Sequence, residues 1–243
     1  MKLIVDIGNT LIKAAVFNED NLEKSFEFGN EEQFTSEKII STYNIEYCLI
    51  SSVKTDADRL ISHLKKQCSV HLFTAQTPLP IKNSYTSPET LGSDRLAAAA
   101  GASALYPNKN VLVIDAGTCI KYNFISDSNE FVGGAISPGL QMRFKALNTF
   151  TARLPLLNLN ESFLILIGTS TNDNILSGVQ TGIIAEVDGI IDQYKSLYNN
   201  LTVVITGGDF NFFVKRLKNS IFADQFLILK GLNKILDNLI DAK

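Results

Sequence analysis

Hydrophobic and polar positions along the chain follow two periodicities, one typical of buried strands and the other of amphipathic helices. Short apolar runs predict strands at residues 3–5, 14–17, 47–50, 70–73, 111–114, 120–125, 131–132 and 203–205. Apolar steps of three and four predict helices at about residues 34–43, 56–66, 93–105, 138–150 and 172–198, with two further helical stretches after residue 209. Asp56 is expected to cap the second of these helices, and Pro138 to occupy the first turn of the fourth. This alternation is typical of an α/β fold.

The strand–turn–strand pattern at the start of the chain recurs near its middle. The run DIGNT, which begins at Asp6, resembles the run DAGT, which begins at Asp115, and each is followed by a strand that holds a lysine, Lys13 or Lys121. The two aspartates are 115 − 6 = 109 residues apart, close to half of the 243-residue chain. We therefore expect two similar α/β halves, residues 1–108 and 109–243, rather than short repeats.

The chemistry of these two turns suits phosphate binding. Glycine allows the backbone to approach a ligand closely, and consecutive N–H groups in a turn form a concavity that binds anions. Thr10 and Thr118 can each add a hydroxyl donor, and a carboxylate at the strand end can hold a hydrated divalent cation. A third glycine turn, Thr206-Gly207-Gly208, also follows a buried strand. Neither G-x-x-x-x-G-K-[ST] nor G-x-G-x-x-G occurs, so the sequence offers no support for those two nucleotide-binding folds.

Composition narrows the classes of protein that remain. Hydrophobic residues make up 45% of the chain and charged residues 19%, which excludes a disordered protein. The formal charge of −3 gives no basic excess for nucleic-acid binding, and no apolar run approaches the length that crosses a membrane. Three unpatterned cysteines (Cys48, Cys68 and Cys119) predict no disulfide framework and favour a reducing cytoplasm. His63 and His71, the only histidines, are expected to be structural, which leaves little material for histidine-based catalysis.

Several segments together resemble one known family. The three turns at residues 6–13 (DIGNTLIK), 115–118 (DAGT) and 206–208 (TGG) resemble the two phosphate motifs and the adenosine motif of the actin-like and sugar-kinase superfamily. Within it, the chain resembles type III pantothenate kinases at residues 83–85 (NSY), 88–95 (PETLGSDR), 133–140 (GGAISPGL), 154–155 (LP) and 168–171 (GTST). The Leu-Gly-x-Asp-Arg segment is the most family-specific of these.

The resemblance implies a fold and an activity. The fold would be two ribonuclease H-like halves, each a mixed sheet with flanking helices, with a cleft between them. The activity would be ATP-dependent phosphorylation of the primary hydroxyl of pantothenate to 4′-phosphopantothenate, the first step of coenzyme A biosynthesis. The resemblance also implies a homodimer, Mg²⁺, and a monovalent cation such as K⁺ or NH₄⁺, with no nucleic-acid or membrane partner.

The resemblance also assigns roles to individual residues. Asp94 would be the catalytic residue that accepts or orients the hydroxyl proton of pantothenate. Asp6 would hold Mg²⁺ directly or through water, and Asp115 would hold the monovalent cation. The residues expected to bind pantothenate are Tyr85, Gly92, Ser93, Asp94, Arg95 and Thr171. Those expected to bind ATP are Asp6, Ile7, Gly8, Asn9, Thr10, Leu11, Ile12, Lys13 and Thr118.

Other interpretations stay open at this point. A non-catalytic ATP-binding regulator, or a kinase for a sugar or for acetate, could share the fold, although neither needs the Tyr85 and Asp94-Arg95 set. Lys13 could simply be a solvent-facing strand residue. The glycines of the long helix (Gly178, Gly182 and Gly189) could serve either core packing or a subunit interface.

Overall fold

The computed structural model describes residues 1–8, 11–52, 58–163 and 165–242. By packing, the chain forms two compact units. The first consists of Met1–Pro107 together with Phe226–Lys243, and the second of Asn108–Gln225. The chain leaves the first unit after Pro107, close to the expected boundary between residues 108 and 109. Its return to the first unit at Phe226 has no counterpart in the sequence pattern.

The first unit is built on a five-stranded mixed sheet in the order β3-β2-β1-β4-β5. β1, β2 and β3 are antiparallel neighbours, and β4 and β5 continue the sheet in parallel with β1. The strands are β1 (Lys2–Ile7), β2 (Ile12–Asn18), β3 (Asn21–Phe28), β4 (Tyr47–Ser52) and β5 (Ser69–Leu72). The unit also contains the two-residue strand β6 (Lys82–Asn83) and a short 3₁₀ turn at Pro88–Thr90.

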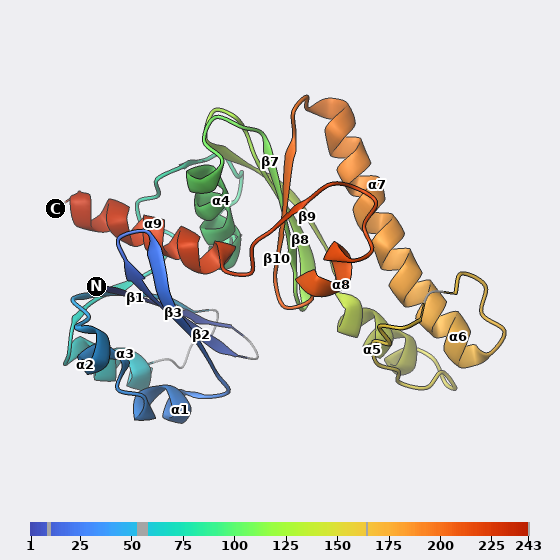
Figure 1. Cartoon of the computed structure of the whole chain (residues 1–243), viewed down its shortest axis with the longest axis horizontal. Coiled ribbons are helices and arrows are strands. Elements are labelled where there is room, and N and C mark those ends of the chain that lie inside the picture. The colour runs from blue at the N-terminus through green and yellow to red at the C-terminus, as the bar shows by residue number, and fades with distance from the viewer. Residues whose placement is uncertain (9–10, 53–57, 164, 243) are drawn as a thin grey trace. The chain divides into compact units, whose positions relative to one another are not determined.

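Both faces of this sheet are covered by helices (Figure 1), which is why its central strand β1 is almost entirely buried and has an apolar middle at residues 3–5. Leu3, Val5 and Ile7 of β1 pack in one cluster with residues of the three short helices on that face. Those helices are α1 (Glu31–Ser36), α2 (Ile39–Tyr43) and α3 (Asp58–Lys65). The long helices α4 (Ser93–Leu105) and α9 (Leu227–Asp241) also contact strands of this sheet.

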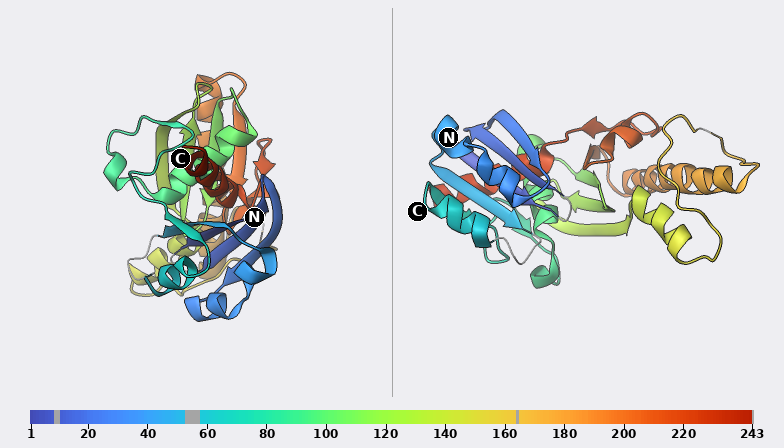
Figure 2. Two further views of the ribbon diagram at one scale, coloured as in Figure 1. Left: turned by 90° about the vertical axis from the view of Figure 1, so that its left-hand side faces the viewer. Right: turned by 90° about the horizontal axis from the view of Figure 1, so that it is seen from below.

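α4 and α9 pack closely against each other, as Figures 1 and 2 show. Residues 97–102 of α4 are all small and all buried, so no polar face is left on that part of the helix. A Cβ atom on Gly231 of α9 would lie 1.7 Å from the carbonyl oxygen of Ala97. The small side chains therefore allow the two backbones to approach, and α9 completes the core of the first unit.

The second unit repeats the topology of the first. Its strands follow the order β11-β10-β7-β8-β9, with β7, β8 and β9 antiparallel and β10 and β11 parallel to β7. They are β7 (Val111–Ala116), β8 (Cys119–Ile125), β9 (Glu130–Pro138), β10 (Thr202–Thr206) and β11 (Phe222–Ala223). The predicted α/β fold with two similar halves is confirmed.

Helices of the second unit share one apolar cluster with its sheet. Ile114 and Tyr122 of the sheet pack there with Phe144, Ile183 and Phe213 from the helices. The helices are α5 (Leu140–Thr149), α6 (Thr171–Leu176), α7 (Gly182–Leu197) and α8 (Phe210–Val214). A π-helical turn, Ser177–Thr181, joins α6 to α7, so the predicted long helix is present with one wide turn inside it.

The short strands β6 and β11 were not expected, and the structure differs from the predicted elements at three further places. The helix expected at residues 34–43 is two short helices, because the chain is extended at Glu37 between them. Pro138 ends β9 instead of opening a helix, and α5 begins after Gly139. The edge strand β3 was not predicted, because its charged residues interrupt the apolar alternation. Asp56, the expected helix cap, lies outside the described residues.

Within the described part of the chain, no helix combines the length and the apolar character that a membrane span requires.

Candidate functional site

Asp94 lies in the first turn of α4, two residues after the N-cap residue Gly92. The backbone N–H of Arg95 donates a hydrogen bond to Oδ1 of Asp94 at 2.8 Å. A Cβ atom on Gly92 would lie 2.7 Å from the same oxygen, so a larger residue there would displace the carboxylate. The positive end of the helix stabilises a carboxylate at this position. The carboxylate of Asp94 is therefore held in a defined place at the start of α4.

Arg95 and Tyr85 form a second part of this site. The Arg95 side chain is buried, although it carries a charge, and its guanidinium carbon lies 5.4 Å from the centroid of the Tyr85 ring. This distance is typical of a cation–π contact. The backbone N–H of Tyr85 donates to Oδ1 of Asn83 at 3.1 Å, which fixes the start of the loop that carries the ring. A guanidinium beside an aromatic ring suits an anionic ligand with an apolar body.

Ser51 connects this site to the first glycine turn. Its hydroxyl lies 3.2 Å from the hydroxyl of Ser93, the residue before Asp94. Ser51 of β4 also lies opposite Asp6 of β1 in the register of these two parallel strands. Two strands and one helix of this unit, β1, β4 and α4, thus place Asp6, Ser51 and Ser93 next to one another. The sequence analysis did not single out Ser51, because serine at a strand end has no distinctive spacing.

The first glycine turn joins β1 to β2. The N–H of Gly8 donates to the carbonyl of Leu11 at 3.0 Å, which closes the turn. The flanking Ile7 and Ile12 side chains are buried, so only their backbone groups are available to a ligand. Lys13 is opposite Asp6 in the pairing, but its ammonium lies 3.7 Å from a carboxylate oxygen of Glu27. Asn9 and Thr10, both expected to bind ATP, lie outside the described residues.

The second glycine turn has the same register. Asp115 of β7 is opposite Lys121 of β8, as Asp6 is opposite Lys13. Here the lysine and the aspartate form an ion pair, in which Lys121 Nζ lies 2.7 Å from Oδ2 of Asp115. The side chain of Thr118 is exposed, and its carbonyl accepts a hydrogen bond from the Gly139 N–H at 3.1 Å. The tip of this turn is thus open to a ligand while its base is held by an ion pair.

The third glycine turn packs directly on the second. Thr206 is the partner of Asp115 in the pairing of β10 with β7. Gly207 has a φ of +95°, and a Cβ there would lie 2.3 Å from the carbonyl oxygen of Ala116. The same carbonyl accepts a hydrogen bond from the Asp209 N–H at 2.9 Å. The structure therefore brings the predicted cation ligand and the predicted adenosine turn together within one unit.

Thr171, expected to bind pantothenate, lines a pocket of about 740 Å³ in the second unit. Ser170 rather than Thr171 caps α6, because its hydroxyl accepts a hydrogen bond from the Asp173 N–H at 3.1 Å. The hydroxyl of Thr171 is thus not needed for capping. The other residues that line this mainly apolar pocket are Arg143, Ala146, Leu147, Leu154, Asn174, Ile175, Gly178 and Val179.

Arg143 belongs to a partly buried polar network at the edge of that pocket. Its guanidinium donates to Glu186, to the Ser137 hydroxyl at 2.9 Å and to the Pro138 carbonyl at 2.9 Å. Burial alone would raise the pKa of Glu186, but the hydrogen bonds from Arg143 and Ser137 outweigh it and hold the pKa below its usual value. The Tyr122 hydroxyl, whose pKa is raised by burial, donates to the same carboxylate at 3.1 Å. Sequence reasoning assigned no role to these residues, because they are far apart along the chain.

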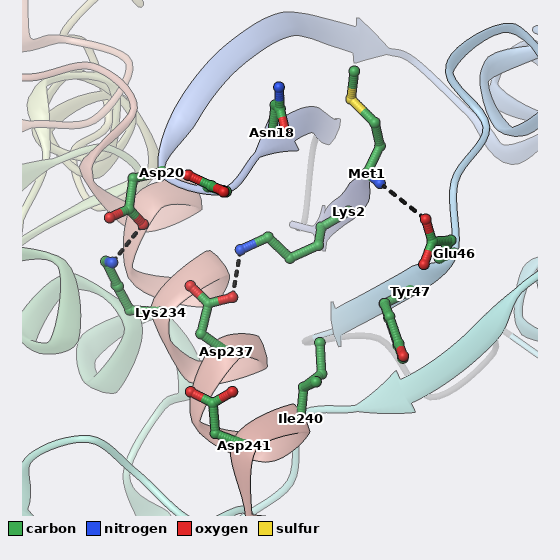
Figure 3. A pocket seen from close by; sticks show the side chains of 11 residues that line it. Met1, Lys2, Asn18, Asp20, Glu46, Tyr47, Lys234, Asp237, Ile240 and Asp241 are labelled. Atoms are coloured by element: carbon green, nitrogen blue, oxygen red, sulfur yellow. Dashed lines mark hydrogen bonds and ion pairs between the residues drawn. The ribbon is translucent and has the colours of Figure 1, made fainter.

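A second hollow, of about 500 Å³, lies in the first unit where α9 meets the sheet (Figure 3). Oppositely charged side chains face one another across it: Lys2 pairs with Asp237, and Lys234 pairs with Asp20. The N-terminal amine of Met1 lies 3.7 Å from a carboxylate oxygen of Glu46. None of the predicted site residues lines this hollow. Its ion pairs fasten α9 to the sheet, so we assign it a structural role.

The predicted site residues thus fall into two groups, one in each unit. The first unit brings together Asp6, Tyr85, Gly92, Ser93, Asp94 and Arg95 with the Gly8–Leu11 turn. The second unit joins Asp115 and Thr118 to the third turn and holds Thr171 in its own pocket. No group of three or more His, Cys, Asp or Glu side chains that could enclose a metal ion occurs among the described residues.

Comparison with known proteins identifies relatives along the whole chain. The family model described as type III pantothenate kinase matches residues 2–193. A type III pantothenate kinase from Flavobacterium johnsoniae is 44% identical over 243 residues, which cover 99% of each chain. One from Bacteroides fragilis is 42% identical and covers 98% of each chain.

A solved structure supports the fold at lower sequence identity. A protein from Campylobacter jejuni, described as a conserved putative Baf family transcriptional activator, superposes with a TM-score of 0.67 and 22% identity. That match covers 98% of this chain and 99% of the other. At this identity the likeness shows the fold alone, whereas the family model and the close relatives establish the family. The chain belongs to the type III pantothenate kinase family.

Proposed function

We propose that this protein transfers the γ-phosphoryl group of ATP to the primary hydroxyl of pantothenate, forming 4′-phosphopantothenate for coenzyme A biosynthesis. The observation that carries the proposal is the arrangement of Asp94, Arg95 and Tyr85 around the start of α4. A protein that only binds ATP would not need an acceptor site of this kind. The membership of the chain in the type III pantothenate kinase family agrees with it.

Asp94 acts on the acceptor hydroxyl. Phosphoryl transfer has a loose transition state, so orienting the attacking oxygen matters more than removing its proton early. The carboxylate of Asp94 accepts the hydroxyl proton as the new P–O bond forms. Gly92 leaves space for this carboxylate, and the Arg95 N–H fixes one of its oxygens. Both features hold the Asp94 carboxylate in one place.

Pantothenate has an anionic end and an apolar dimethyl group beside the reacting hydroxyl. Arg95 offers a planar guanidinium for the carboxylate or for the charge that develops on the phosphoryl group. Tyr85 packs against the apolar part, and the Ser93 hydroxyl adds a polar contact. Thr171 contributes a hydroxyl from the lining of a mainly apolar pocket, which suits a ligand that has both polar and apolar parts.

The glycine turns bind the triphosphate of ATP. In the first turn, Gly8, Asn9, Thr10 and Leu11 bind the phosphates through groups other than the Gly8 N–H, which is bonded to the Leu11 carbonyl. Lys13 adds a positive charge, and its long contact to Glu27 is weak enough to exchange for a phosphate. In the second unit, the exposed Thr118 hydroxyl contacts ATP.

Two cations complete the proposed site. Mg²⁺ commonly binds through one or two carboxylates together with substrate phosphates and water, so Asp6 alone at its strand end is a sufficient protein ligand. The absence of a larger acidic cluster among the described side chains fits that mode. When bound, Mg²⁺ neutralises charge on the transferring phosphate. Oδ1 of Asp115, which accepts no hydrogen bond from the described residues, suits a monovalent cation such as K⁺ or NH₄⁺.

We also propose a homodimer that uses the long helix of the second unit. A methyl group on Gly178, Gly182 or Gly189 would meet no described atom within 4 Å, so these glycines do not serve packing inside the chain. Leu166 and Ile167 nearby in sequence are 72% and 78% exposed. Light scattering after size exclusion should give twice the mass of one chain, and Gly182→Arg should give the mass of one chain.

The activity is tested by mass spectrometry of the products. The protein is incubated with ATP, Mg²⁺ and K⁺, and separately with pantothenate, glucose or acetate as acceptor. The proposal expects phosphopantothenate from the first mixture alone. Phosphorylated glucose or acetyl phosphate would favour another small-molecule kinase. Tight ATP binding without any product, across a screen of cations, would favour a regulator.

A further inference from the structure

Two of the three cysteines lie together in the first unit, outside the groups assigned to ATP and pantothenate. Cys48 belongs to β4, and Cys68 lies between α3 and β5. β4 and β5 pair in parallel, with Cys48 opposite Val70, only two residues after Cys68. Both cysteine side chains pack in the same apolar cluster. The fold therefore brings together two thiols that are twenty residues apart in sequence (68 − 48 = 20).

The two thiols lie close enough for the ionisation of each to depend on the other. A hydrogen bond between them lowers the pKa of Cys68 and, together with burial, raises the pKa of Cys48 well above its usual value. The Cys68 sulfur also lies 3.7 Å from the carbonyl oxygen of Leu64, to which its thiol can donate. Of the two thiols, Cys68 therefore loses its proton more readily.

The accessibility of the two thiols has the same asymmetry. Cys48 is completely buried, whereas Cys68 is partly exposed. A small oxidant can therefore reach Cys68 but not Cys48. Thiolates rather than thiols attack peroxides, so the accessible sulfur is also the more reactive one. An attacking cysteine beside a protonated second cysteine is the usual arrangement of a reversible thiol oxidation site.

We propose that Cys68 and Cys48 form a hydroperoxide-sensitive dithiol that closes to an intramolecular disulfide. The Cys68 thiolate attacks one oxygen of a hydroperoxide, forming an S–O bond and breaking the O–O bond, and the leaving oxygen takes up a proton. The Cys48 sulfur then attacks the resulting sulfenic acid, forming the S–S bond. The S–O bond breaks, and its oxygen leaves as water with the proton of Cys48. Two sulfur atoms together lose two electrons, and the peroxide gains them.

This modification would connect two parts of the sheet near the site. The disulfide would join β4 to the segment that precedes β5 and would enclose α3 in a covalent loop. β4 also carries Ser51, the partner of Asp6 and Ser93. The proposal itself concerns only the thiol chemistry, so it stands whether or not the chain phosphorylates pantothenate.

The test treats the reduced full-length protein with hydrogen peroxide under denaturant-free conditions and blocks the remaining thiols before digestion. We expect a peptide pair joined through Cys48 and Cys68, lighter than the two reduced peptides by two hydrogens. Free thiols should fall from three to one, and the remaining one should be Cys119, which serves as the internal control. Thioredoxin or dithiothreitol should restore all three.

Variants test the order of events. Cys48→Ala should leave Cys68 as a sulfenic acid that a dimedone probe captures, and Cys68→Ser should leave Cys48 unlabelled in the folded protein. If either variant fails to fold, peptide mapping of the wild-type protein decides alone. Oxidation of Cys119 before Cys68 would overturn the proposal. So would disulfides between chains, or irreversible oxidation of Cys68 while Cys48 stays a free thiol.

Discussion

Lys121 Nζ lies 2.7 Å from Oδ2 of Asp115, whereas the ammonium of Lys13, the equivalent lysine of the first unit, lies 3.7 Å from a carboxylate oxygen of Glu27. The two turns share one register but differ in what neutralises the aspartate. The Asp115 side chain is only 8% exposed, so an uncompensated charge there would be costly. An ion pair at one oxygen leaves the other oxygen for the monovalent cation that we propose at this site.

Asp115→Asn should remove the dependence of the reaction on the monovalent cation. Turnover of the wild-type protein is expected to fall when Na⁺ replaces K⁺, because Na⁺ is smaller and holds its water more strongly. In the variant the two salts should give equal, low rates. The exposed residue Asp127, replaced by Asn, is the matched control and should keep the wild-type preference. Asp115 would not be the cation ligand if its variant still distinguished K⁺ from Na⁺.

Gly207→Ala should destabilise the second unit, whereas Gly208→Ala should not. The first substitution places a Cβ 2.3 Å from the Ala116 carbonyl oxygen at a positive φ, and the second meets no described atom within 4 Å. We expect a loss of about 2–3 kcal/mol for Gly207→Ala and about 0.5 kcal/mol or less for its neighbour. Thermal and urea unfolding measure the difference. Equal stability of the two variants would contradict the close packing of the two turns.

Glu186 should make the stability of the protein depend on acid pH. Its pKa in the folded state is lowered from an ordinary value of 4.5, so the charged form binds Arg143 more tightly than the protonated form. The stabilisation is therefore present at neutral pH and is lost as the pH falls below about 4.5 through the lowered pKa. Glu186→Gln should cost about 1 kcal/mol at pH 7 and less at pH 3.

The control for this experiment is Glu23→Gln, which changes an exposed carboxylate of β3. Its effect on the thermal midpoint should be small at both pH values. If Glu186→Gln lowers the stability of the protein equally at pH 7 and at pH 3, the network stabilises the fold through packing rather than through charge.

Much of this architecture is predictable because the repeated glycine turn can be recognised from its local sequence. DIGNT and DAGT each follow a buried strand, and that pattern predicted two similar halves that the structure confirms. The family resemblance also follows from local motifs, and the family model and close relatives confirm it. The roles assigned to single residues, Asp94 foremost, stay predictions.

Other features depend on long-range packing and leave no local trace. The return of α9 to the first unit rests on glycine and alanine contacts with α4, and on ion pairs such as Lys2 with Asp237. The π-helical turn adds one residue to a helical turn without disturbing the apolar steps that predict a helix. The proximity of Ser51 to Ser93 depends on the register of β4 against β1, which hydrophobic periodicity does not specify.

The central claim is that Asp94 directs the pantothenate hydroxyl while other residues bind ATP, and the variant Asp94→Asn tests it most directly. It keeps the size of the side chain but cannot accept a proton, so the turnover number should fall by about 10²- to 10⁴-fold. Calorimetry should find an ATP dissociation constant within about twofold of the wild-type value, which corresponds to about 0.4 kcal/mol. The exposed acid Glu89, replaced by Gln, should leave both quantities unchanged. Normal phosphopantothenate formation by Asp94→Asn, or loss of ATP binding in parallel with activity, would contradict the account.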